Sequence, residues 1–258
     1  MPTLAELDQR YTQQAGWTSS IRQSLLSQVD LEHCQTVLEV GCGTGAVLDT
    51  LPRPPQFHVG IDLDLPTLRF AREKHPALLL AAADALRLPY ASASFEITFC
   101  HFFLLWVTQP LAALAEMRRV TRPGGWVIAF AEPDHAHRLD FPTGLEEIGR
   151  RQTQALQQQG AEPRAGRKLR GWFAQTGLEQ VYCGLLGGEW QSGGTLPPGW
   201  EQEWSTLRSD LAAEVPAAEL DHWQQLDRRA WLSGERVLYV PTFFAIGRKP
   251  ENEEHENS

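Results

Sequence analysis

Cysteines are few in this chain of 258 residues, and long apolar runs are absent. Cys34, Cys42, Cys100 and Cys183 are widely spaced and form no C-x-x-C pair, which argues against a disulfide framework and against a zinc cluster. No apolar run approaches the roughly 18 residues that begin to indicate a membrane span, and residues 1–14 lack a charged-then-apolar leader. We therefore predict a soluble protein of the reducing cytoplasm, with no membrane partner.

An excess of basic residues is also lacking. The sequence holds 32 Asp plus Glu against 23 Lys plus Arg, which gives a net charge of −9. A net negative protein repels a phosphate backbone unless its basic residues gather on one face. Nucleic acid is therefore not an expected partner, and the length suits a single α/β domain with insertions.

Apolar periodicity predicts the secondary structure of the first half. Residues 3–29 repeat apolar side chains mostly at three- and four-residue steps, with a soft break at Gly16, which predicts a helical N-terminal flap. From Thr36 onward short β-rich runs alternate with helical ones, as is typical of βαβ units and a mainly parallel sheet. The expected strands are Thr36–Val40, Phe57–Ile61, Leu78–Ala82, Phe95–His101 and Trp126–Ala131, and the expected helices are Ala46–Leu51, Leu65–Lys74 and Pro110–Thr121.

Beyond Asp134 the rhythm becomes irregular. We expect helices at about 143–159 and 167–176 and a strand at Glu179–Leu186. A largely helical insert then runs to about Leu232, before a final strand at Val237–Ile246. The polar, acidic residues 250–258 are expected to be disordered.

The strongest local pattern is the run Val37 to Gly45, in which a strand enters a glycine-rich turn. Glycines let the backbone turn sharply and let a ligand lie against the main chain. In an open parallel sheet that turn lies at the carboxyl edge, where ligands bind. Because Ala46 follows, the run also satisfies the dinucleotide pattern G-x-G-x-x-A, with Asp62 at the right distance to accept from ribose hydroxyls. A nicotinamide cofactor is therefore one hypothesis.

Glu39 argues against that hypothesis. A carboxylate at the end of a buried strand is costly unless a cation or hydrogen-bond donors meet it. The ammonium of a methionine portion would supply such a partner, whereas a pyrophosphate would be repelled. Asp84 ends the next strand, where it can accept from an adenine amine. Asp62 and Asp84 are also consistent with turn caps, and Glu39 with a basic partner inside the fold, but three carboxylates at successive strand ends favour a nucleoside site.

In these motifs the sequence resembles the class I S-adenosylmethionine-dependent methyltransferases, type 11, over about residues 33–135. The run 39–45 resembles their glycine motif, 60–63 their ribose-binding motif and 83–85 their adenine-binding motif. Residues 88–96 resemble the approach to strand four, with Glu96 where Asp is commoner, and 116–125 the corner before strand five. The resemblance implies an α/β, Rossmann-like, doubly wound sheet of seven strands whose last strand, expected at Val237–Ile246, is antiparallel.

The resemblance also implies S-adenosylmethionine as cofactor. Glycines would lie against its methionine and ribose portions, Asp62 at the ribose and Asp84 with Ala85 at the adenine. His101 would touch the methionine portion, and Tyr11 in the flap would cover the cofactor. The residues expected at the cofactor are Tyr11, Glu39, Gly41, Cys42, Gly43, Asp62, Leu63, Asp84, Ala85 and His101.

This interpretation also divides the chain. It predicts one domain over 1–249, with the flap at 1–30, the cofactor-binding half at 31–135 and the last core strand at 236–248. Residues 136–235 would form a variable, mainly helical cap with one core strand.

The acceptor of the methyl group is not indicated, because the match fades after Asp134. No Asn-Pro-Pro-Tyr-like run follows strand four and no Pro-Cys nucleophile occurs, which disfavours amino methylation of adenine or glutamine and disfavours cytosine C5 chemistry. We expect a small molecule that accepts at oxygen or nitrogen. Five tryptophans would either form the core of the cap or contact this acceptor: Trp190, Trp200, Trp204, Trp223 and Trp231.

Methyl transfer is a direct displacement, so catalysis depends mainly on holding the nucleophile in line, and a general base is optional. Candidates for that base follow strands four and five: His101, Glu132, Asp134, His135 and His137. For His101 a binding or lining role is the preferred interpretation, since an imidazole at a strand end is often simply hydrogen-bonded. No metal site is expected, because no third ligand cluster accompanies the Asp134-His135-x-His137 run.

Two other functions remain open. One is a nicotinamide-dependent oxidoreductase, which the G-x-G-x-x-A pattern supports and Glu39 and Asp84 oppose. The other is a non-catalytic module that has kept the cofactor fold, because a fold does not determine a function. The sequence does not indicate the oligomeric state.

Overall fold

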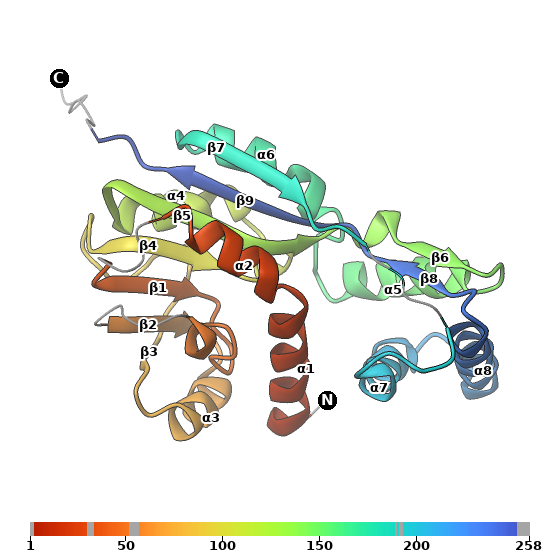
Figure 1. The fold of residues 1–258 in the computed structure, drawn as a ribbon. Coiled ribbons are helices and arrows are strands. Elements are labelled where there is room, and N and C mark those ends of the chain that lie inside the picture. Colours follow the sequence, from red (N-terminus) through yellow and green to blue (C-terminus); the bar gives the residue numbers. More distant parts are fainter. Residues whose placement is uncertain (1–2, 30–33, 52–56, 189, 191–192, 252–258) are drawn as a thin grey trace.

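The centre of the fold is a sheet of seven strands, seen in a computed structural model that describes residues 3–29, 34–51, 57–188, 190 and 193–251 (Figure 1). The strands of the first half are parallel, whereas β9 is antiparallel to both of its neighbours. The expected doubly wound α/β fold, with an antiparallel last strand, is confirmed. In spatial order the strands are β3 (Leu79–Ala82), β2 (Phe57–Asp62), β1 (Thr36–Val40), β4 (Phe95–Cys100), β5 (Thr121–Pro133), β9 (Thr242–Arg248) and β7 (Glu179–Leu185).

Helices cover both faces of this sheet. The flap helix α2 (Ser19–Leu26) packs with α3 (Leu65–Lys74) on one face, and α4 (Pro110–Val120) packs with α6 (Ala165–Gln175) on the other. Neighbouring residues of a strand point to opposite faces, so Val37 enters one core and Leu38 the other. Because both faces are covered, β5 and β9 contain continuous apolar runs, at residues 126–131 and 243–246.

The late part of the chain forms a cap beyond one end of the sheet (Figure 1). The cap contains α5 (Glu146–Gln158), α7 (Trp200–Leu211), α8 (Ala217–Ser233) and a two-stranded sheet of β6 (Leu139–Phe141) and β8 (Val237–Tyr239). Trp200, Trp204 and Trp223 are buried in the cap's own core, Trp231 packs against that core, and Trp190 is exposed. The cap therefore has a separate core, to which most of its tryptophans contribute.

The helix expected at Ala46–Leu51 is instead a single 3₁₀ turn at Leu48–Thr50. Gly45 has a positive φ of 79°, so the helical conformation can begin only after it. Leu51 precedes a proline in the sequence and is extended, with φ −65° and ψ 137°, as the steric clash with a following proline ring favours. Only one turn fits between these two residues.

The prediction of one unbroken final strand at Val237–Ile246 is wrong. The segment forms two strands in two different sheets, β8 in the cap and β9 in the central sheet, separated at Val240 and Pro241. Proline has no N–H to donate to a ladder, so an uninterrupted strand through Pro241 is disfavoured. The last core strand consequently begins at Thr242.

Other expected elements occur with small shifts at their ends. β5 extends beyond the expected Trp126–Ala131 at both ends and follows α4 directly. Of the tail expected to be disordered, residues 252–258 lie outside the described residues. None of the helices in the described part of the chain combines the length and apolar character needed to cross a bilayer.

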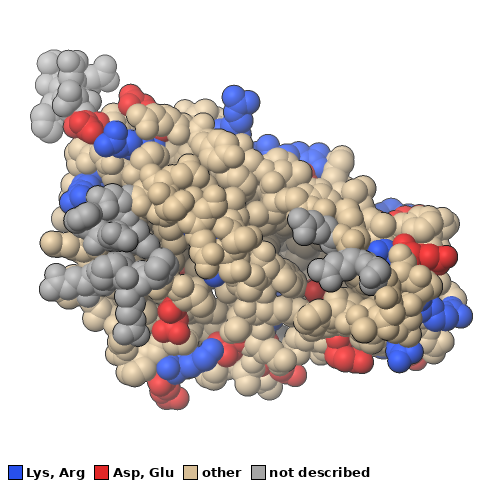
Figure 2. All heavy atoms as spheres, in the orientation of Figure 1, with Lys and Arg blue, Asp and Glu red and all other residues tan. Residues whose placement is uncertain are grey.

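Charged side chains are mixed on the face drawn in Figure 2. There, Lys and Arg are interspersed with Asp and Glu around a largely uncharged central area. Among the described residues of this face, neither sign forms a continuous track.

A buried ionic network joins the elements of the cap. Asp227 on α8 accepts hydrogen bonds from the indole N–H groups of Trp200 and Trp204, at 2.5 and 2.8 Å, and from Arg236 Nε at 2.6 Å. Arg236 also donates to Asp140 on β6 at 2.7 Å, and Asp140 accepts from Arg138. Two guanidinium groups and two carboxylates thus neutralise one another in the interior of the cap.

We expect Asp227→Ala to lower the free energy of unfolding by about 3–5 kcal/mol, because it removes one partner of a buried ion pair and leaves two indole N–H groups unpaired. Urea unfolding followed by tryptophan fluorescence measures this change. The control is Asp221→Ala on the same helix, whose side chain is exposed and pairs with Arg208, with an expected loss below about 1 kcal/mol. Equal effects of the two substitutions would contradict the structural role of Asp227.

Candidate functional site

The glycine-rich turn after β1 lies at the carboxyl edge of the sheet. Gly41 and Gly43 have positive φ angles of 75° and 51°, which residues with a side chain rarely adopt. A Cβ atom on Gly41 would lie 2.2 Å from the Phe103 ring, and one on Gly43 would lie 2.9 Å from the Tyr11 ring. Two aromatic rings therefore pack against bare backbone at this turn, and their position requires glycine at both places.

Glu39 is buried at the end of β1, with 2% of its surface exposed. Its Oε2 atom has no hydrogen-bond partner among the described residues. Burial raises the pKa of Glu39 well above its ordinary range, while a hydrogen bond from the Leu48 backbone and the charge of Arg22 act in the opposite direction. A buried carboxylate oxygen without a partner suits an ammonium group and opposes a pyrophosphate.

Asp62 ends β2 beside this turn. Its two carboxylate oxygens accept from the backbone N–H groups of Gly43, at 2.8 Å, and Asp64, at 3.0 Å. Each carboxylate oxygen can accept a second hydrogen bond, so capacity for ribose hydroxyls remains. Asp62 therefore orders the glycine turn and still faces the cavity, next to the exposed Leu63.

Asp84 follows β3, and the structure shows the turn-cap role that the sequence left as one of two alternatives. Its Oδ1 atom accepts from the Leu86 N–H at 2.9 Å, which is a local turn cap. Asp84 also lines the same cavity as Asp62, together with the buried Ala85.

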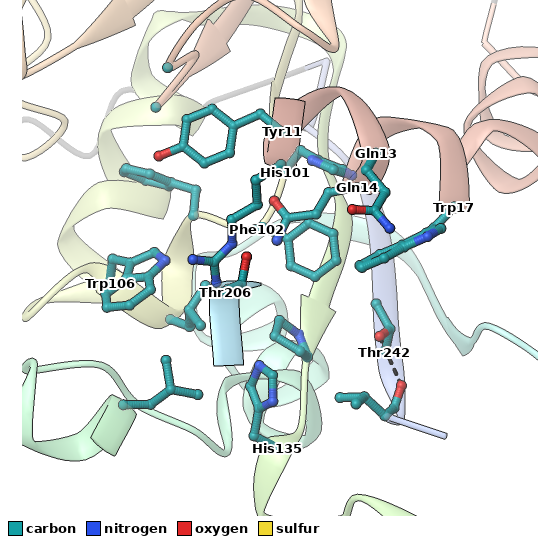
Figure 3. Close-up of a pocket in the computed structure, with 18 of the residues that line it drawn as sticks. Tyr11, Gln13, Gln14, Trp17, His101, Phe102, Trp106, His135, Thr206 and Thr242 are labelled. Carbon is teal, nitrogen blue, oxygen red and sulfur yellow. Dashed lines mark hydrogen bonds between the residues drawn. The ribbon is translucent and has the colours of Figure 1, made fainter. Parts of the chain in front are cut away.

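These groups line a cavity of about 970 Å³ that runs from the sheet edge to the cap (Figure 3). Its volume is at the upper end for ligand pockets, which leaves room for a nucleoside cofactor and a second molecule. The structure brings all ten residues expected at the cofactor to its wall: Tyr11, Glu39, Gly41, Cys42, Gly43, Asp62, Leu63, Asp84, Ala85 and His101.

Helix α1 (Leu4–Trp17) forms one wall of the cavity. Tyr11 lies over the glycine turn. Arg10, Gln13, Gln14 and Trp17, spaced three, one and three residues apart, form a continuous helical face that also lines the cavity. Figure 3 shows Gln13, Gln14 and Trp17 beside Tyr11 on this helix. The flap therefore contributes to both ends of the cavity.

The loop after β4 forms a further part of the wall, with His101, Phe102 and Trp106 (Figure 3). Phe102 has a positive φ of 48°, a costly conformation that a tightly determined loop must impose. Glu132 helps to fix the conformation of this loop. Its carboxylate accepts from the backbone N–H groups of Phe103, Leu104 and Leu105, at 3.0, 2.8 and 3.1 Å.

The structure separates the candidates for a general base. Glu132 is fully buried and is not part of the cavity wall, and its carboxylate is occupied by the loop, although burial raises its pKa to about 7. Asp134 pairs with Arg167, with Arg167 Nη2 at 2.7 Å from Oδ1, and His137 lies outside the cavity. We therefore do not assign a proton-transfer role to these three residues.

His101 and His135 both line the cavity. Burial lowers the pKa of each imidazole to about 3, so both are neutral near pH 7. His101 Nε2 lies 2.8 Å from the Thr18 hydroxyl, which fits the preferred binding role. His135 Nδ1 is buried without a hydrogen-bond partner among the described residues, so it can meet a group of a ligand. No group of three or more potential metal ligands occurs within the described ranges.

Some residues of the site were not anticipated from the sequence. Thr18 contacts His101 from the flap. Arg22 donates to Thr18, and its charge acts on Glu39. Glu203 lines the cavity from α7. A signal existed for Glu203, which lies three residues after Trp200 and four before Leu207, on the apolar face of its helix. Phe103 had no such signal, because its position depends on Glu132.

Comparisons with known proteins agree with this architecture. The family model described as "Methyltransferase domain" matches residues 38–129. A demethylmenaquinone methyltransferase of Renibacterium salmoninarum is 32% identical over 170 residues, covering 64% of this chain and 71% of that protein. A malonyl-[acyl-carrier protein] O-methyltransferase of a Marinomonas species is 32% identical over 125 residues, so the match spans less than half of that protein, 46%, and 46% of this chain.

A solved structure extends the likeness to the fold of nearly the whole chain. The crystal structure of a putative sarcosine dimethylglycine methyltransferase from Galdieria sulphuraria superposes with a TM-score of 0.55 at 14% identity, covering 91% of this chain and 85% of that one. The fold and the cavity define a Rossmann-like nucleoside-binding protein. The chain belongs to the class I S-adenosylmethionine-dependent methyltransferases, and its cofactor is S-adenosylmethionine.

Burial of His135 predicts a pH-dependent stability. Because its pKa is lowered in the folded protein, unfolding takes up a proton, and the free energy of unfolding falls as the pH drops from about 6.5 toward about 3. In the variant His135→Gln, unfolding should take up about one proton fewer. The slope of the free energy of unfolding against pH should therefore be smaller by about 1.4 kcal/mol per pH unit in that window. Urea titrations of both proteins between pH 4.5 and pH 6.5 measure the two slopes, and equal slopes would show that His135 is accessible to protons in the folded state.

Proposed function

We propose that this protein transfers the methyl group of S-adenosylmethionine to a small molecule that accepts at oxygen or nitrogen. The unpartnered, buried Glu39 oxygen beside a glycine turn is the observation that carries the cofactor end of the proposal. The two relatives above are named for different acceptors, so the acceptor has to be inferred from the cavity of this chain.

The acceptor would occupy the part of the cavity between α1, the β4 loop and the cap. Tryptophans line the cavity from four places in the fold: Trp17 on α1, Trp106 after β4, Trp200 and Trp204 on α7, and Trp231 on α8. The nearby charges of Arg138 and Arg236 are neutralised by Asp140 and Asp227. The aromatic lining favours an acceptor with an aromatic or aliphatic skeleton.

Glu203 is the group that we assign to the acceptor. It is partly buried and lines the cavity, and its carboxylate has no hydrogen bond or ion pair to the rest of the described chain. Burial raises the pKa of Glu203, and Arg138 opposes this shift. A carboxylate with a raised pKa is a better proton acceptor than an ordinary one, so Glu203 can bind an O–H or N–H group and take up its proton.

The chemistry requires little more than positioning. S-adenosylmethionine supplies a methyl group on a sulfonium, from which it is displaced directly. Glu39 would hold the ammonium of the methionine portion, Asp62 the ribose, and Tyr11 would cover the nucleoside. The walls formed by α1 and the cap would exclude water and hold the nucleophile in line, from which much of the rate enhancement can come.

Two further attributes belong to this proposal. The chain has only four cysteines and no C-x-x-C pair, which suits the reducing cytoplasm, in which we place the protein. The domain divisions at 1–30, 31–135 and 136–235 remain a proposal for how the flap, cofactor binding and the cap are shared along the chain. Within the division at 236–248, Val237–Tyr239 belongs to the cap sheet and Thr242–Arg248 to the central sheet.

Calorimetric titration with S-adenosylmethionine, S-adenosylhomocysteine and NADH tests the cofactor assignment. We expect saturable binding of both sulfur nucleosides and none of NADH. Asp62→Ala should weaken binding at least about tenfold, because it removes ribose hydrogen bonds and the acceptor that orders Gly43. The control Asp49→Ala changes an exposed carboxylate just after the glycine turn. Binding of NADH alone would favour an oxidoreductase, and binding of no ligand by folded protein would favour a non-catalytic module.

Glu203→Gln tests the acceptor end with radiolabelled S-adenosylmethionine and a metabolite pool as the source of acceptors. We expect methyl transfer to fall at least about tenfold, since the carboxylate that binds the acceptor and takes its proton is lost. Binding of S-adenosylhomocysteine should stay within about twofold of the wild type. The control is Glu201→Gln, two residues away on the exposed face of α7. Unchanged transfer by Glu203→Gln would remove Glu203 from the acceptor site.

A further inference from the structure

A chain of buried polar groups links the N-terminal flap to the cofactor end of the cavity. Arg22 on α2 donates through Nη1 to the Thr18 hydroxyl and to the Ala15 carbonyl, and through Nη2 to the Thr50 hydroxyl at 3.2 Å. The Thr18 hydroxyl lies 2.8 Å from His101 Nε2. Arg22, Thr18 and His101 are exposed by only 5%, 1% and 9%, so water does not substitute for these contacts.

The direction of the central hydrogen bond follows from the donors present. A guanidinium only donates, so Arg22 occupies a lone pair of the Thr18 oxygen. The single hydroxyl proton of Thr18 can then go to His101 Nε2 or to the carbonyls of Gln14 and Ala15. Both carbonyls are 3.3 Å away, beyond the usual 2.5–3.0 Å of an O–H···O bond, and the Ala15 carbonyl already accepts from Arg22. The hydroxyl therefore donates to Nε2.

A neutral imidazole that accepts at Nε2 carries its proton on Nδ1. We propose that Arg22 and Thr18 are positioning residues that hold His101 in its Nδ1–H tautomer, so that it presents a hydrogen-bond donor to the carboxylate of the cofactor's amino-acid end. Within the described chain, Nδ1 has no hydrogen-bond partner, and the residue lines the cavity. The choice of ligand depends on the proposed function, whereas the tautomer does not.

The opposite charges of an amino acid explain why the cavity needs both a donor and an acceptor there. Glu39 offers an unpartnered carboxylate oxygen, which suits the ammonium. His101 with a proton on Nδ1 offers the complementary donor, which suits the carboxylate. The charge of Arg22 also acts on Glu39 and favours its ionised form. One buried arginine of the flap would thus support both contacts with the amino-acid end.

Thr18→Val tests this proposal, because valine has the shape of threonine and lacks the hydroxyl. Two probes distinguish the ends of the cofactor: S-adenosylhomocysteine, and 5′-methylthioadenosine, which has the nucleoside and sulfur but no amino-acid end. We expect Thr18→Val to weaken the binding of S-adenosylhomocysteine about three- to tenfold, which corresponds to the loss of one hydrogen bond. The binding of 5′-methylthioadenosine should weaken by less than about twofold. Thr18→Ser should restore the wild-type ratio, and Thr12→Val, at an exposed position of α1, is the matched control.

Long-range ¹⁵N–¹H NMR of the histidine rings provides a readout that is independent of binding, with His101→Gln to assign the signals. The wild type should show the Nδ1–H tautomer at His101, and Thr18→Val should lose it or mix it with the Nε2–H form. An Nε2–H tautomer in the wild type, or equal weakening of both probes by Thr18→Val, would overturn the proposal. If the wild type binds neither probe, the cofactor assignment fails. The observed tautomer then decides by itself whether Arg22 and Thr18 hold His101 in the Nδ1–H form.

Discussion

The parallel arrangement of β1, β2, β3 and β4 is the constraint on which the site depends. Parallel neighbours end at the same edge of a sheet, so residues that end or follow these strands meet in space although they are far apart in the sequence. Glu39, Asp62, Asp84 and His101 come together for this reason. The glycine turn lies at the same edge and exposes backbone there, which permits close approach of a nucleoside.

The flap and the β4 loop complete this edge through packing and buried hydrogen bonds. Tyr11 and Phe103 lie against the two glycines that lack a Cβ atom, one from each wall. Phe103 is held there because Glu132 accepts from the backbone of its loop. The flap is tied to the same edge by Arg22 and Thr18, so residues outside the glycine motif determine how the cofactor end is lined.

The cap provides a second, separately stabilised wall. Its aromatic core is organised around Asp227, which gathers two tryptophans and Arg236. A buried ionic cluster of this kind contributes less to net stability than to the specific arrangement of its elements, in our interpretation. It leaves Glu203 as the carboxylate of α7 that faces the cavity without a protein partner.

Much of the fold could be predicted because the signals are local. Strand runs alternate with helical runs, and the carboxylates at strand ends occur within short motifs. The helix at Ala46–Leu51 was overestimated because periodicity does not register the positive φ of Gly45 or the restriction on Leu51. The continuous strand at Val237–Ile246 was overestimated because its apolar character hid the break at Pro241, which sends β8 and β9 to different sheets.

The sequence by itself determined the α/β class, the glycine turn and the carboxylates at successive strand ends, since these depend on short-range pattern and on the rule that parallel strands share an edge. Tertiary structure alone decided which polar groups are satisfied. Glu132 and Asp134 are adjacent to cavity residues in the chain, yet one is occupied by loop backbone and the other by Arg167. Thr18 reaches His101, and Glu203 reaches the cavity, from elements distant in sequence. Contacts of that kind are set by packing, which local sequence does not encode.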